Sequence, residues 1–481
     1  MVKVTRSDLQ ITPDPHRVVA RPFLPGEPAF AGGPSRVEMI ANRVLTLTDS
    51  EAEDLLAETK ASFAGRHPDL ARIWHQNASW AETMVPSLAN VESGRRDLLG
   101  AFFTQEYAPE AVAVCNPSMV PAPNADDGRF IMSIRAIGEG HISSVEFRTG
   151  SVDDHGTVTV DAPDRFLSIG DRRSPSYDKE VFTHKLLALN ADAALVERVM
   201  TQLPDRFTAR ELDTALEILE RVEAAPASVF ETRKLIHWMS ASNYELAYRG
   251  EEPISERILL PSSPAESRGI EDARFVRFTE ADGTVSYYAT YTAYDGYTIL
   301  PQLIETDDFS AFRFATLNGS CARNKGMALF PRRVGGFYAA LGRHDQENLH
   351  LLRSDQLRVW NHAELITSPT QGWETVQIGT CGSPIETDQG WLVLTHGVGP
   401  MRRYALGVFL LDLDDPSRLI GRLKSPLLEP GSDERDGYVP NVVYSCGAML
   451  HEDWLIIPYG FADEGIHLAK VSVAELLHEM S

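Results

Sequence analysis

Gly269-Ile-Glu-Asp-Ala-Arg274 opens a pair of strands whose second member ends in Tyr291-Thr-Ala-Tyr-Asp-Gly296. The first segment places two acids and an arginine beside a small residue, and the second adds polar groups at a turn. One predicted hairpin therefore presents four polar side chains near its ends: Asp272, Arg274, Tyr294 and Asp295. Carboxylates and an arginine in one cluster suit the binding of a sugar and the protonation of a glycosidic oxygen.

This hairpin contains one of five similar segments in the chain. Each has an aromatic or glycine-led strand, a polar turn and a second alternating strand. The five strands are Gly128–Arg135, Val285–Thr292, Gly336–Arg343, Gly390–His396 and Asp453–Tyr459. The last four recur about every 50–65 residues, the span expected of one propeller blade. The repeat therefore predicts an all-β domain made of propeller blades.

The gap between the first and second of these strands is too long for one blade, so we expect an insert there. Residues 190–248 show apolar side chains at helical spacing. Examples are Leu195, Val199 and Leu203, followed by Leu212, Leu216 and Leu219. Residues 48–105 also have a helical pattern, whereas residues 12–36 are rich in proline and glycine and are typical of an extended arm.

These patterns divide the chain into two parts. We predict an N-terminal arm and helical region over residues 1–108, and a catalytic domain over residues 109–481 that carries the helical insert. The first long helix is expected to be capped by Asp49 or Ser50. The added helices either form a lid or an oligomer contact, or simply pack against the side of the propeller.

Composition excludes one class of partner. The chain has 481 residues, with 43% hydrophobic and 23% charged residues, which fits a globular protein with a sizeable core. Its formal net charge is −23, so nucleic acid is not an expected partner, because phosphate backbones favour basic surfaces. A small anionic substrate remains compatible, since a local basic site can exist within an acidic protein.

The lack of a recognisable secretory signal and the spacing of the cysteines predict a cytoplasmic location. The N-terminal residues lack the apolar stretch of a secretory signal, and no run reaches the roughly 18 apolar residues of a membrane span. The four cysteines lie far apart in the sequence and form no CxxC pair: Cys115, Cys321, Cys381 and Cys446. We expect reduced, mostly buried thiols, with no metal site.

Polar residues stand at the strand ends of every repeat, and the innermost strands of propeller blades end around one axis. The groups expected to converge there include Asn116, Arg135, Ser144, Glu271, Asp272, Arg274, Tyr294, Asp295, Lys325, Arg343, His396 and Asp463. Carboxylates suit acid catalysis and sugar hydroxyls, whereas arginine forks match phosphate oxygens. An inverting hydrolase needs an acid and a separate basic carboxylate. A phosphorylase needs only the acid once phosphate is positioned, and the cationic groups favour this second arrangement.

Each of these residues also has an ordinary structural interpretation. Asp272 could be a turn aspartate, and Asp295 could make the tight turn expected of Asp-Gly. Lys325 and Arg343 could be surface charges. His396 lies on an apolar strand, where a histidine is by default a hydrogen-bonded part of the core. Their equivalent positions in a repeat strengthen the functional interpretation of the set.

Together, four motifs resemble glycoside hydrolase family 130, the β-mannoside phosphorylases and related mannosidases. They are Gly-Ile-Glu-Asp-Ala-Arg at 269–274, Thr-Ala-Tyr-Asp-Gly at 292–296, Pro-Ile-Glu-Thr-Asp-Gln-Gly-Trp at 384–391 and Val-Pro-Asn-Val-Val at 439–443. The similarity runs from about Asn116 to Ala469, interrupted by the helical insert. It implies a five-bladed β-propeller and inverting phosphorolysis of β-mannosides to α-mannose 1-phosphate.

The resemblance also implies roles for single residues. Asp272 matches the family's general acid, whose proton is thought to pass through the 3-hydroxyl of the bound mannosyl unit. Asp463 matches an aspartate that holds the mannosyl ring. The phosphate-binding set is matched by Lys325, Arg343 and His396, and other sugar-facing positions by Asn116, Arg135 and Asp295. Two features depart from the family: alanine stands at position 273 in place of the usual proline, and shorter members lack the added helices.

The sequence therefore predicts an all-β, five-bladed β-propeller with added N-terminal and inserted helical segments, and a β-mannoside phosphorylase favouring β-1,2-linked manno-oligosaccharides. The candidate substrate-binding residues are Asn116, Arg135, Ser144, Glu271, Arg274, Tyr294, Asp295 and Asp463. Inorganic phosphate is the expected co-substrate, with no cofactor and no membrane partner, and a homo-oligomer is left open. The alternatives are an inverting β-mannosidase that uses water and a non-catalytic glycan-binding propeller.

Overall fold

The computed structural model describes residues 2–26, 34–124, 127–220, 227–250, 252–297 and 299–480. The chain divides into two compact units. Unit 1 comprises Met1–Pro13, Val112–Pro163 and Ile169–Ser481, and unit 2 comprises Asp14–Ala111 and Asp164–Ser168. The first residues of the chain therefore belong to unit 1, although they lie within the predicted N-terminal region of residues 1–108. No helix of the described residues is long and apolar enough to cross a membrane.

Unit 2 is mainly helical. Its elements are β2 (Val19–Pro22), α1 (Arg36–Leu45), α2 (Asp49–Phe63), α3 (Leu70–Met84), α4 (Ser93–Phe102) and β3 (Thr104–Tyr107). The cap of α2 is Thr48, and not Asp49 or Ser50 as predicted. Thr48 and Glu51 form a reciprocal capping box, in which each side chain accepts a hydrogen bond from the other residue's backbone N–H. The predicted arm over residues 12–36 contains β2, and its residues 27–33 lie outside the described residues.

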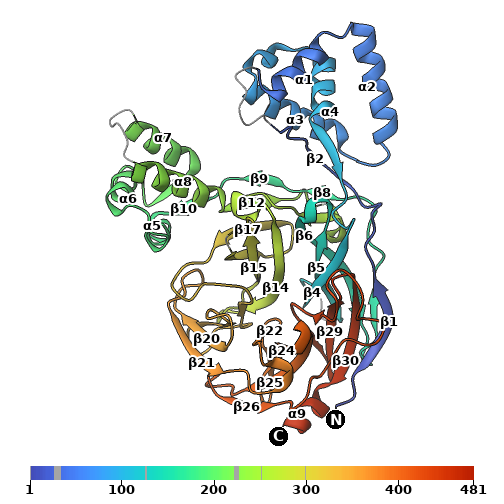
Figure 1. Cartoon of the computed structure of the whole chain (residues 1–481), viewed down its shortest axis with the longest axis vertical. Coiled ribbons are helices and arrows are strands. Elements are labelled where there is room, and N and C mark those ends of the chain that lie inside the picture. The colour runs from blue at the N-terminus through green and yellow to red at the C-terminus, as the bar shows by residue number, and fades with distance from the viewer. Residues whose placement is uncertain are drawn as a thin grey trace. The chain divides into compact units, whose positions relative to one another are not determined.

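The described part of unit 1 is mostly β and contains five antiparallel groups of four or more strands (Figure 1). The first group is β4 (Ala113–Pro121), β5 (Arg129–Ile137), β6 (Ser143–Val152) and β7 (Val158–Val160). The second is β14 (Gly269–Thr279), β15 (Val285–Tyr294), β16 (Ile299–Thr306) and β17 (Ala311–Thr316), extended by β12 (Tyr244–Ala247) and β9 (Asp171–Arg173). A parallel pair between Gly269 and Ser143 joins these two groups into one sheet.

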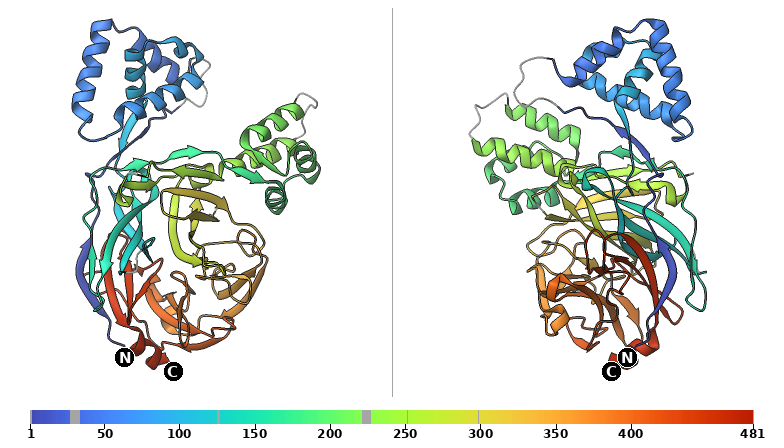
Figure 2. Two further views of the ribbon diagram at one scale, coloured as in Figure 1. Left: turned by 180° about the vertical axis from the view of Figure 1, so that it is seen from behind. Right: turned by 45° about the vertical axis from the view of Figure 1, so that its right-hand side comes forward.

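Three further sheets form the remaining groups. One is β18 (Ala328–Leu329), β19 (Tyr338–Gly342), β20 (Leu349–Ser354) and β21 (His362–Thr367). The next is β22 (Gln377–Thr380), β24 (Gly390–Val398), β25 (Tyr404–Leu411) and β26 (Leu419–Arg422), with β23 (Ile385–Thr387) on β24. The last is β27 (Val443–Tyr444), β29 (Trp454–Phe461), β30 (Gly465–Ser472) and β1 (Thr5–Ile11), with β28 (Met449–His451) on β29. Because β1 pairs with β30, the sheet joins the two chain ends, which lie side by side in both views of Figure 2.

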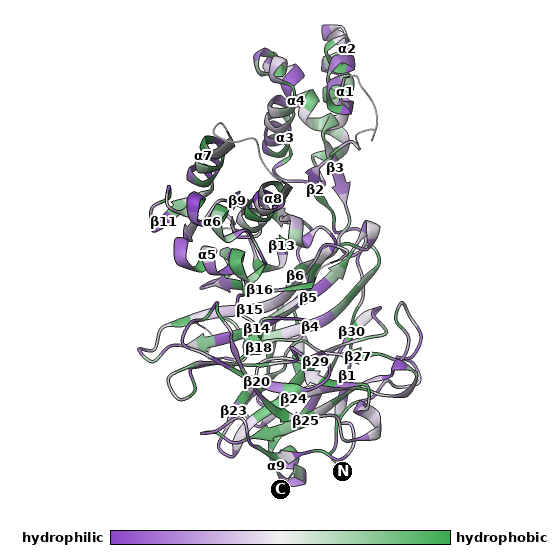
Figure 3. Ribbon diagram, turned by 60° about the vertical axis from the view of Figure 1, so that its left-hand side comes forward, coloured by the Kyte–Doolittle hydropathy of each residue, from purple (hydrophilic) through white to green (hydrophobic). Residues whose placement is uncertain are grey.

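The predicted repeat is confirmed at the level of strands. The five segments predicted from the sequence fall on β5, β15, β19, β24 and β29. Each of these strands pairs antiparallel on both sides. Strands β24 and β25 are apolar along most of their length, as their colour in Figure 3 shows, and they are buried on both faces. Because both faces of these strands are buried, they appear in the sequence as continuous apolar runs.

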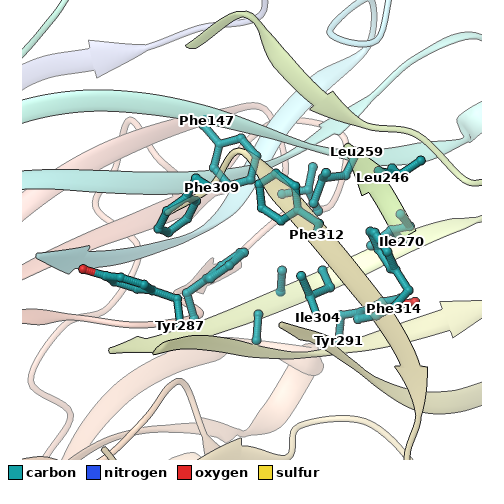
Figure 4. Close-up of a cluster of buried hydrophobic side chains, with 14 of the residues drawn as sticks. Phe147, Leu246, Leu259, Ile270, Tyr287, Tyr291, Ile304, Phe309, Phe312 and Phe314 are labelled. Carbon is teal, nitrogen blue, oxygen red and sulfur yellow. The ribbon is translucent and has the colours of Figure 1, made fainter. Parts of the chain in front are cut away.

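A compact aromatic core supports the second group of strands (Figure 4). The rings of Phe147 and Phe312 stack with their centroids 5.6 Å apart, and Phe309 meets Phe147 edge-on at 5.7 Å. Burying a side chain of this size stabilises the fold by roughly 1.5–3 kcal/mol. The strand β14, which carries Asp272, therefore rests on a densely packed base.

The insert is helical, with boundaries that differ from those predicted. It comprises α5 (Lys179–Ala188), α6 (Ala193–Met200), α7 (Ala209–Glu220) and α8 (Ala227–Ala241), which lie together in Figure 1, with β10 (Ser176–Asp178) and β11 (Arg206–Thr208). Relative to the predicted span of 190–248, helix begins earlier, at Lys179. The last residues of the predicted span form strand β12, because Tyr244–Ala247 pairs with β17. Residues 221–226 of the predicted insert lie outside the described residues.

The insert has its own core and polar attachments to the strands of unit 1. Its apolar side chains, among them Phe182, Val199 and Leu212, form a separate buried cluster. Lys185 Nζ donates a 2.5 Å hydrogen bond to the carbonyl of Leu317. Directly after α8, Asn243 Oδ1 accepts from the backbone N–H of Thr316 at 3.0 Å.

Candidate active site

Two strand bulges bring the first pair of predicted residues together. The register shifts between Cys115 and Ser118 in β4 and between Glu271 and Arg274 in β14. Asn116 and Asp272 occupy these bulges with left-handed backbones, at φ values of 49° and 56°. Asn116 Nδ2 donates a 2.6 Å hydrogen bond to Asp272 Oδ1. Bulges re-aim side chains and are enriched next to active sites, so the local backbone singles out these two residues.

Asp272 is surrounded by cations. Arg135 Nη1 donates to its Oδ1 at 3.3 Å, and Arg274 Nη2 lies 3.9 Å from its Oδ2. Burial alone would raise the pKa of Asp272, but the positive charges of Arg135, Arg274 and Lys325 outweigh it and lower the pKa to about 2. The side chain is therefore an ionised carboxylate at neutral pH.

Glu271 links two of the predicted residues across strands. Its Oε1 accepts from Arg135 Nη2 at 2.7 Å, and its Oε2 accepts from Lys325 Nζ at 2.5 Å. Arg135 Nε also donates to Ser143 Oγ at 2.9 Å. Glu271 thus fixes Arg135 and Lys325 beside Asp272, and the Nζ of Lys325 also lies 6.0 Å from the ring centre of Tyr294.

A second part of the site presents buried donors that lack a partner. Within the described part of the chain, nothing accepts a hydrogen bond from Arg343 Nε, Arg343 Nη1 or Arg274 Nε. The remaining nitrogens of Arg274 are held, because Nη1 donates to the carbonyl of Asp272 and Nη2 to the hydroxyl of Tyr444, both at 2.8 Å. Burial lowers the pKa of Arg343. Buried guanidinium N–H groups without acceptors are costly, and an anion would satisfy them.

His396 lies beside these arginines as a neutral imidazole. Burial, Arg343 and Arg274 hold its pKa well below the ordinary value. Its Nδ1 faces Cys381 Sγ at 4.0 Å, and burial raises the pKa of Cys381 to about 12, so the thiol keeps its proton. Which of these two atoms donates depends on the imidazole tautomer. Gly379 makes room for the ring, since a Cβ there would lie 2.7 Å from His396 Cε1.

Asp463 completes the set after strand β29. It has a left-handed backbone with φ of 50°, and no described residue donates a hydrogen bond to its carboxylate. Burial raises the pKa of Asp463, while the charge of Arg135 opposes the shift. A carboxylate with free acceptor oxygens next to Arg135 and Asp272 suits sugar hydroxyls, which donate hydrogen bonds.

Three predicted residues make hydrogen bonds to nearby backbone groups. Ser144 is buried in the sheet, where its hydroxyl lies 3.5 Å from the carbonyl of Ala136. Tyr294 donates to the carbonyl of Gly296 at 3.1 Å. Asp295 Oδ1 accepts from the backbone N–H of Tyr297 at 2.8 Å, which is the turn role considered as its ordinary interpretation.

Three residues of the cluster are not in the candidate set, although two of them lie in polar segments at strand ends, Ser143 in His141-Ile-Ser-Ser144 and Tyr404 in Arg402-Arg-Tyr404. Ser143 contacts Arg135, in place of its neighbour Ser144. Tyr444 holds Arg274, and Tyr404 stacks on His396 with ring centroids 6.0 Å apart. For Tyr444 the sequence signal was its position directly after Val439–Val443.

The arrangement therefore contains one ionised carboxylate that neighbouring groups hold in place, one carboxylate with free acceptors and a group of unsatisfied cationic donors. Such a site can bind a polyol through Asp463 and Asn116 and an oxyanion through Arg274 and Arg343. Among the described residues, no group of three or more His, Cys, Asp or Glu side chains is arranged to hold a metal ion.

Comparison with known proteins identifies relatives of the second half of the chain. A family model described as beta-1,4-mannooligosaccharide phosphorylase, that of glycoside hydrolase family 130, matches residues 240–481. This match includes Asp272, Arg343 and Asp463, whereas Asn116 and Arg135 lie before it.

Three curated relatives are mannoside phosphorylases. The chain is 33% identical over 234 residues to a 1,2-beta-oligomannan phosphorylase of Thermoanaerobacter sp. (strain X514), covering 46% of this chain and 75% of that protein. It is 36% identical over 224 residues to a beta-1,2-mannobiose phosphorylase of the same strain, covering 46% and 72%. It is 31% identical over 229 residues to a beta-1,2-mannobiose phosphorylase of Listeria innocua, covering 46% of this chain and 63% of that relative's length.

Proposed function

The chain belongs to glycoside hydrolase family 130, and from this premise we propose that it catalyses the phosphorolysis of β-mannosides, with β-1,2-linked manno-oligosaccharides as the favoured substrates. Phosphate attacks the anomeric carbon from the face opposite the leaving group. The bond between that carbon and the glycosidic oxygen breaks, and a bond to a phosphate oxygen forms. The products are α-mannose 1-phosphate and an acceptor shortened by one unit.

In this reaction Asp272 is the general acid that supplies the proton for the leaving oxygen. Asp463 and Asn116 bind the mannosyl unit, and Arg135 keeps Asp272 oriented. Phosphate lies against Arg274 and Arg343, with His396 donating one further hydrogen bond. Positioning of the nucleophile and neutralisation of its charge are the main contributions of such a site.

The protonation of Asp272 depends on phosphate in this proposal. A general acid must carry a proton, yet the surrounding cations lower the pKa of Asp272 to about 2. A bound phosphate dianion offsets the positive charge of Arg274 and of neighbouring groups and thereby raises that pKa. The acid then becomes competent only when the nucleophile is present, which disfavours hydrolysis.

The observation that carries the proposal is the group of buried guanidinium N–H donors without partners on Arg343 and Arg274. A β-mannosidase that uses water has no need of an anion site, and needs a second carboxylate as base. A non-catalytic glycan-binding propeller has no need of a buried acid beside that site.

The test is incubation of the protein with β-1,2-mannobiose with and without inorganic phosphate. We expect mannose 1-phosphate in the α configuration, formed only with phosphate, and detected by proton and phosphorus NMR. Free mannose formed at the same rate without phosphate would establish the hydrolase instead. Binding of the disaccharide without any product would establish the binding module.

The proposal also covers the fold, the cellular location and the oligomeric state. We propose that the five antiparallel groups of unit 1 are the blades of a five-bladed β-propeller, which the pairing of β1 with β30 supports as a ring closure. The four free cysteines suit a cytoplasmic location. No cofactor besides the co-substrate phosphate enters the reaction, and a homo-oligomer remains part of the hypothesis.

A further inference from the structure

Two neighbouring cavities follow the helical insert. The larger, of about 980 Å³, lies between α5 and residues 299–300 and 318–324. The smaller, of about 480 Å³, lies between residues 189–191, α8 and the start of β16. Leu189 and Leu300 line both, so the cavities adjoin each other, and we call the two together the insert groove.

The insert groove reaches the surroundings of the candidate active site at two points. The larger cavity is lined by Arg323 and Asn324, which directly precede Lys325. The smaller is lined by Asp295, which directly follows Tyr294. Since Glu271 pairs with Thr292, Asp295 lies about 10 Å further along the same strand direction, at a rise of about 3.3 Å per residue.

One buried side chain in the larger cavity has no partner. Asn318 is 2% exposed, and neither its Nδ2 nor its Oδ1 has a hydrogen-bond partner among the described residues. A buried amide left in this state costs about 1–3 kcal/mol for each group. Such an exception in a folded protein calls for a ligand or a bound water.

The loop that carries Asn318 is firmly held. Its backbone N–H donates to the carbonyl of Arg358, and its carbonyl accepts from the N–H of Trp360, both at 2.8 Å. Asn361 Oδ1 accepts from the N–H of Ser320 at 3.0 Å. On the opposite wall, the buried Lys185 of α5 bonds to the carbonyl of Leu317. The site is therefore formed before any ligand binds, which lowers the entropic cost of binding.

The lining favours a neutral polyhydroxylated ligand. Its polar side chains are mostly amides and carboxylates: Asp178, Glu180, Asn324, Asp355, Gln356 and Asn361. Amides both donate and accept, and carboxylates accept, which matches sugar hydroxyls. Three carboxylates outnumber the two cations of the larger cavity, Lys185 and Arg323, which disfavours an anion. Trp238 in the smaller cavity offers an aromatic surface.

We propose that the insert groove binds the distal mannosyl units of an oligosaccharide whose terminal unit occupies the candidate active site. Asn318 and Gln356 contact sugar hydroxyls, and α5 forms the wall that decides how many units are held. The protein is then selective for longer β-mannosides over the disaccharide. This inference rests on the proposed function, because it places the groove on the same substrate.

The experiment measures kcat/KM at saturating phosphate for β-1,2-mannobiose and for longer homologues up to mannohexaose. The variants are Gln356→Ala and Asn318→Ala. Gln356 is exposed, so its removal leaves the fold intact. Gln389→Ala is the matched control, since Gln389 is an exposed glutamine at the turn between β23 and β24.

We expect each groove variant to lose about 2- to 10-fold in kcat/KM on the long substrates, the value of one or two hydrogen bonds. The kcat/KM for the disaccharide and the KM for phosphate should each change by less than about 2-fold, a difference below about 0.5 kcal/mol. The control should match the wild type throughout. Calorimetric melting temperatures of all proteins separate a loss of binding from a loss of fold.

The outcomes separate the groove from the reaction. Equal losses on all substrate lengths, or an unchanged length profile in Gln356→Ala and in a folded Asn318→Ala, would overturn the groove while phosphorolysis stands. If the wild type releases no mannose 1-phosphate from any length, the proposed function is wrong, and the groove assignment falls with it.

Discussion

Two buried carboxylates of unit 1 differ in every respect that decides their use. Asp272 is held by cations, which lower its pKa to about 2, and unsatisfied arginine donors lie beside it. Glu266 is fully buried among neutral donors, and burial raises its pKa. It accepts from the hydroxyls of Tyr244 and Tyr291 and from the backbone N–H groups of Ser262 and Ser263, at 2.6–3.1 Å.

The difference separates structural from functional polarity. Both Glu266 oxygens already accept hydrogen bonds from the protein itself, so a ligand would gain little there. Around Asp272, Arg274 and Arg343 the protein leaves donors and acceptors open, at a cost to stability that a bound anion and a sugar would offset. Substitutions at Glu266, Asp272 and Arg343 test whether the two carboxylates differ in this way.

The largest expected effect is on stability, at Glu266. Glu266→Ala leaves two tyrosine hydroxyls and two backbone N–H groups without acceptors, so we expect the free energy of unfolding to fall by about 3–5 kcal/mol. Chemical denaturation measures this. Glu266→Gln is the control and should cost less than about 1.5 kcal/mol, because the amide keeps the volume and an acceptor oxygen. If Glu266→Ala is as stable as the wild type, the network is not structural.

The next effect is on turnover, at Asp272. Asp272→Asn removes the acid but keeps the shape, so kcat should fall by at least about 10²-fold while the mannoside still binds. Steady-state kinetics with β-1,2-mannobiose and phosphate give the result. Calorimetric titration of the disaccharide into the variant supplies the binding control. Near-normal turnover would remove Asp272 from the mechanism.

The third effect is confined to phosphate, at Arg343. Arg343→Ala should raise the KM for phosphate by about 10-fold or more, the value of a charge-assisted hydrogen bond, and change the KM for the mannoside little. Its stability should be equal to or above that of the wild type, since a buried unsatisfied guanidinium is removed. Arg332→Ala is the matched control, because that arginine pairs with Glu386 at the surface. Equal rises in both KM values would indicate a general structural role.

The β architecture was largely predictable from the sequence because alternation and spacing are local signals. All five predicted strands exist, and each pairs on both sides. The start of the helical insert was not predictable, since the short strand β10 and helix α5 have weak amphipathic patterns. The cap at Thr48 was missed because acidic residues at Asp49 and Glu51 are compatible with several starting points.

The sequence predicted which residues belong to the candidate site better than it predicted how they are arranged. The sequence contained Asn116 and Asp272, but nothing in it revealed that both lie in bulges with left-handed backbones. It selected Ser144 where Ser143 contacts Arg135, because a shift of one residue along a strand exchanges the two faces. Tyr444 was missed because its role depends on Arg274, which lies 170 residues away in the sequence.

The smallest expected effect is on the pH dependence of stability, and it has opposite signs at the two carboxylates. The folded pKa of Asp272, about 2, is below the unfolded value of about 3.9. The contribution of Asp272 to the free energy of unfolding is therefore largest at pH values well above the unfolded pKa, and it declines as the pH falls towards 2. Between about pH 7 and pH 3, the stability advantage of the wild type over Asp272→Asn should shrink by about 1 kcal/mol.

Glu266 has a folded pKa above its unfolded value, so its contribution is present below the unfolded pKa and is lost as the pH rises through the folded one. The stability of the wild type relative to Glu266→Gln should therefore improve towards acid pH, whereas relative to Asp272→Asn it worsens. Denaturation curves of the three proteins across this range measure both slopes. Slopes of the same sign would mean that the two carboxylates share one kind of environment, against the contrast on which their different roles rest.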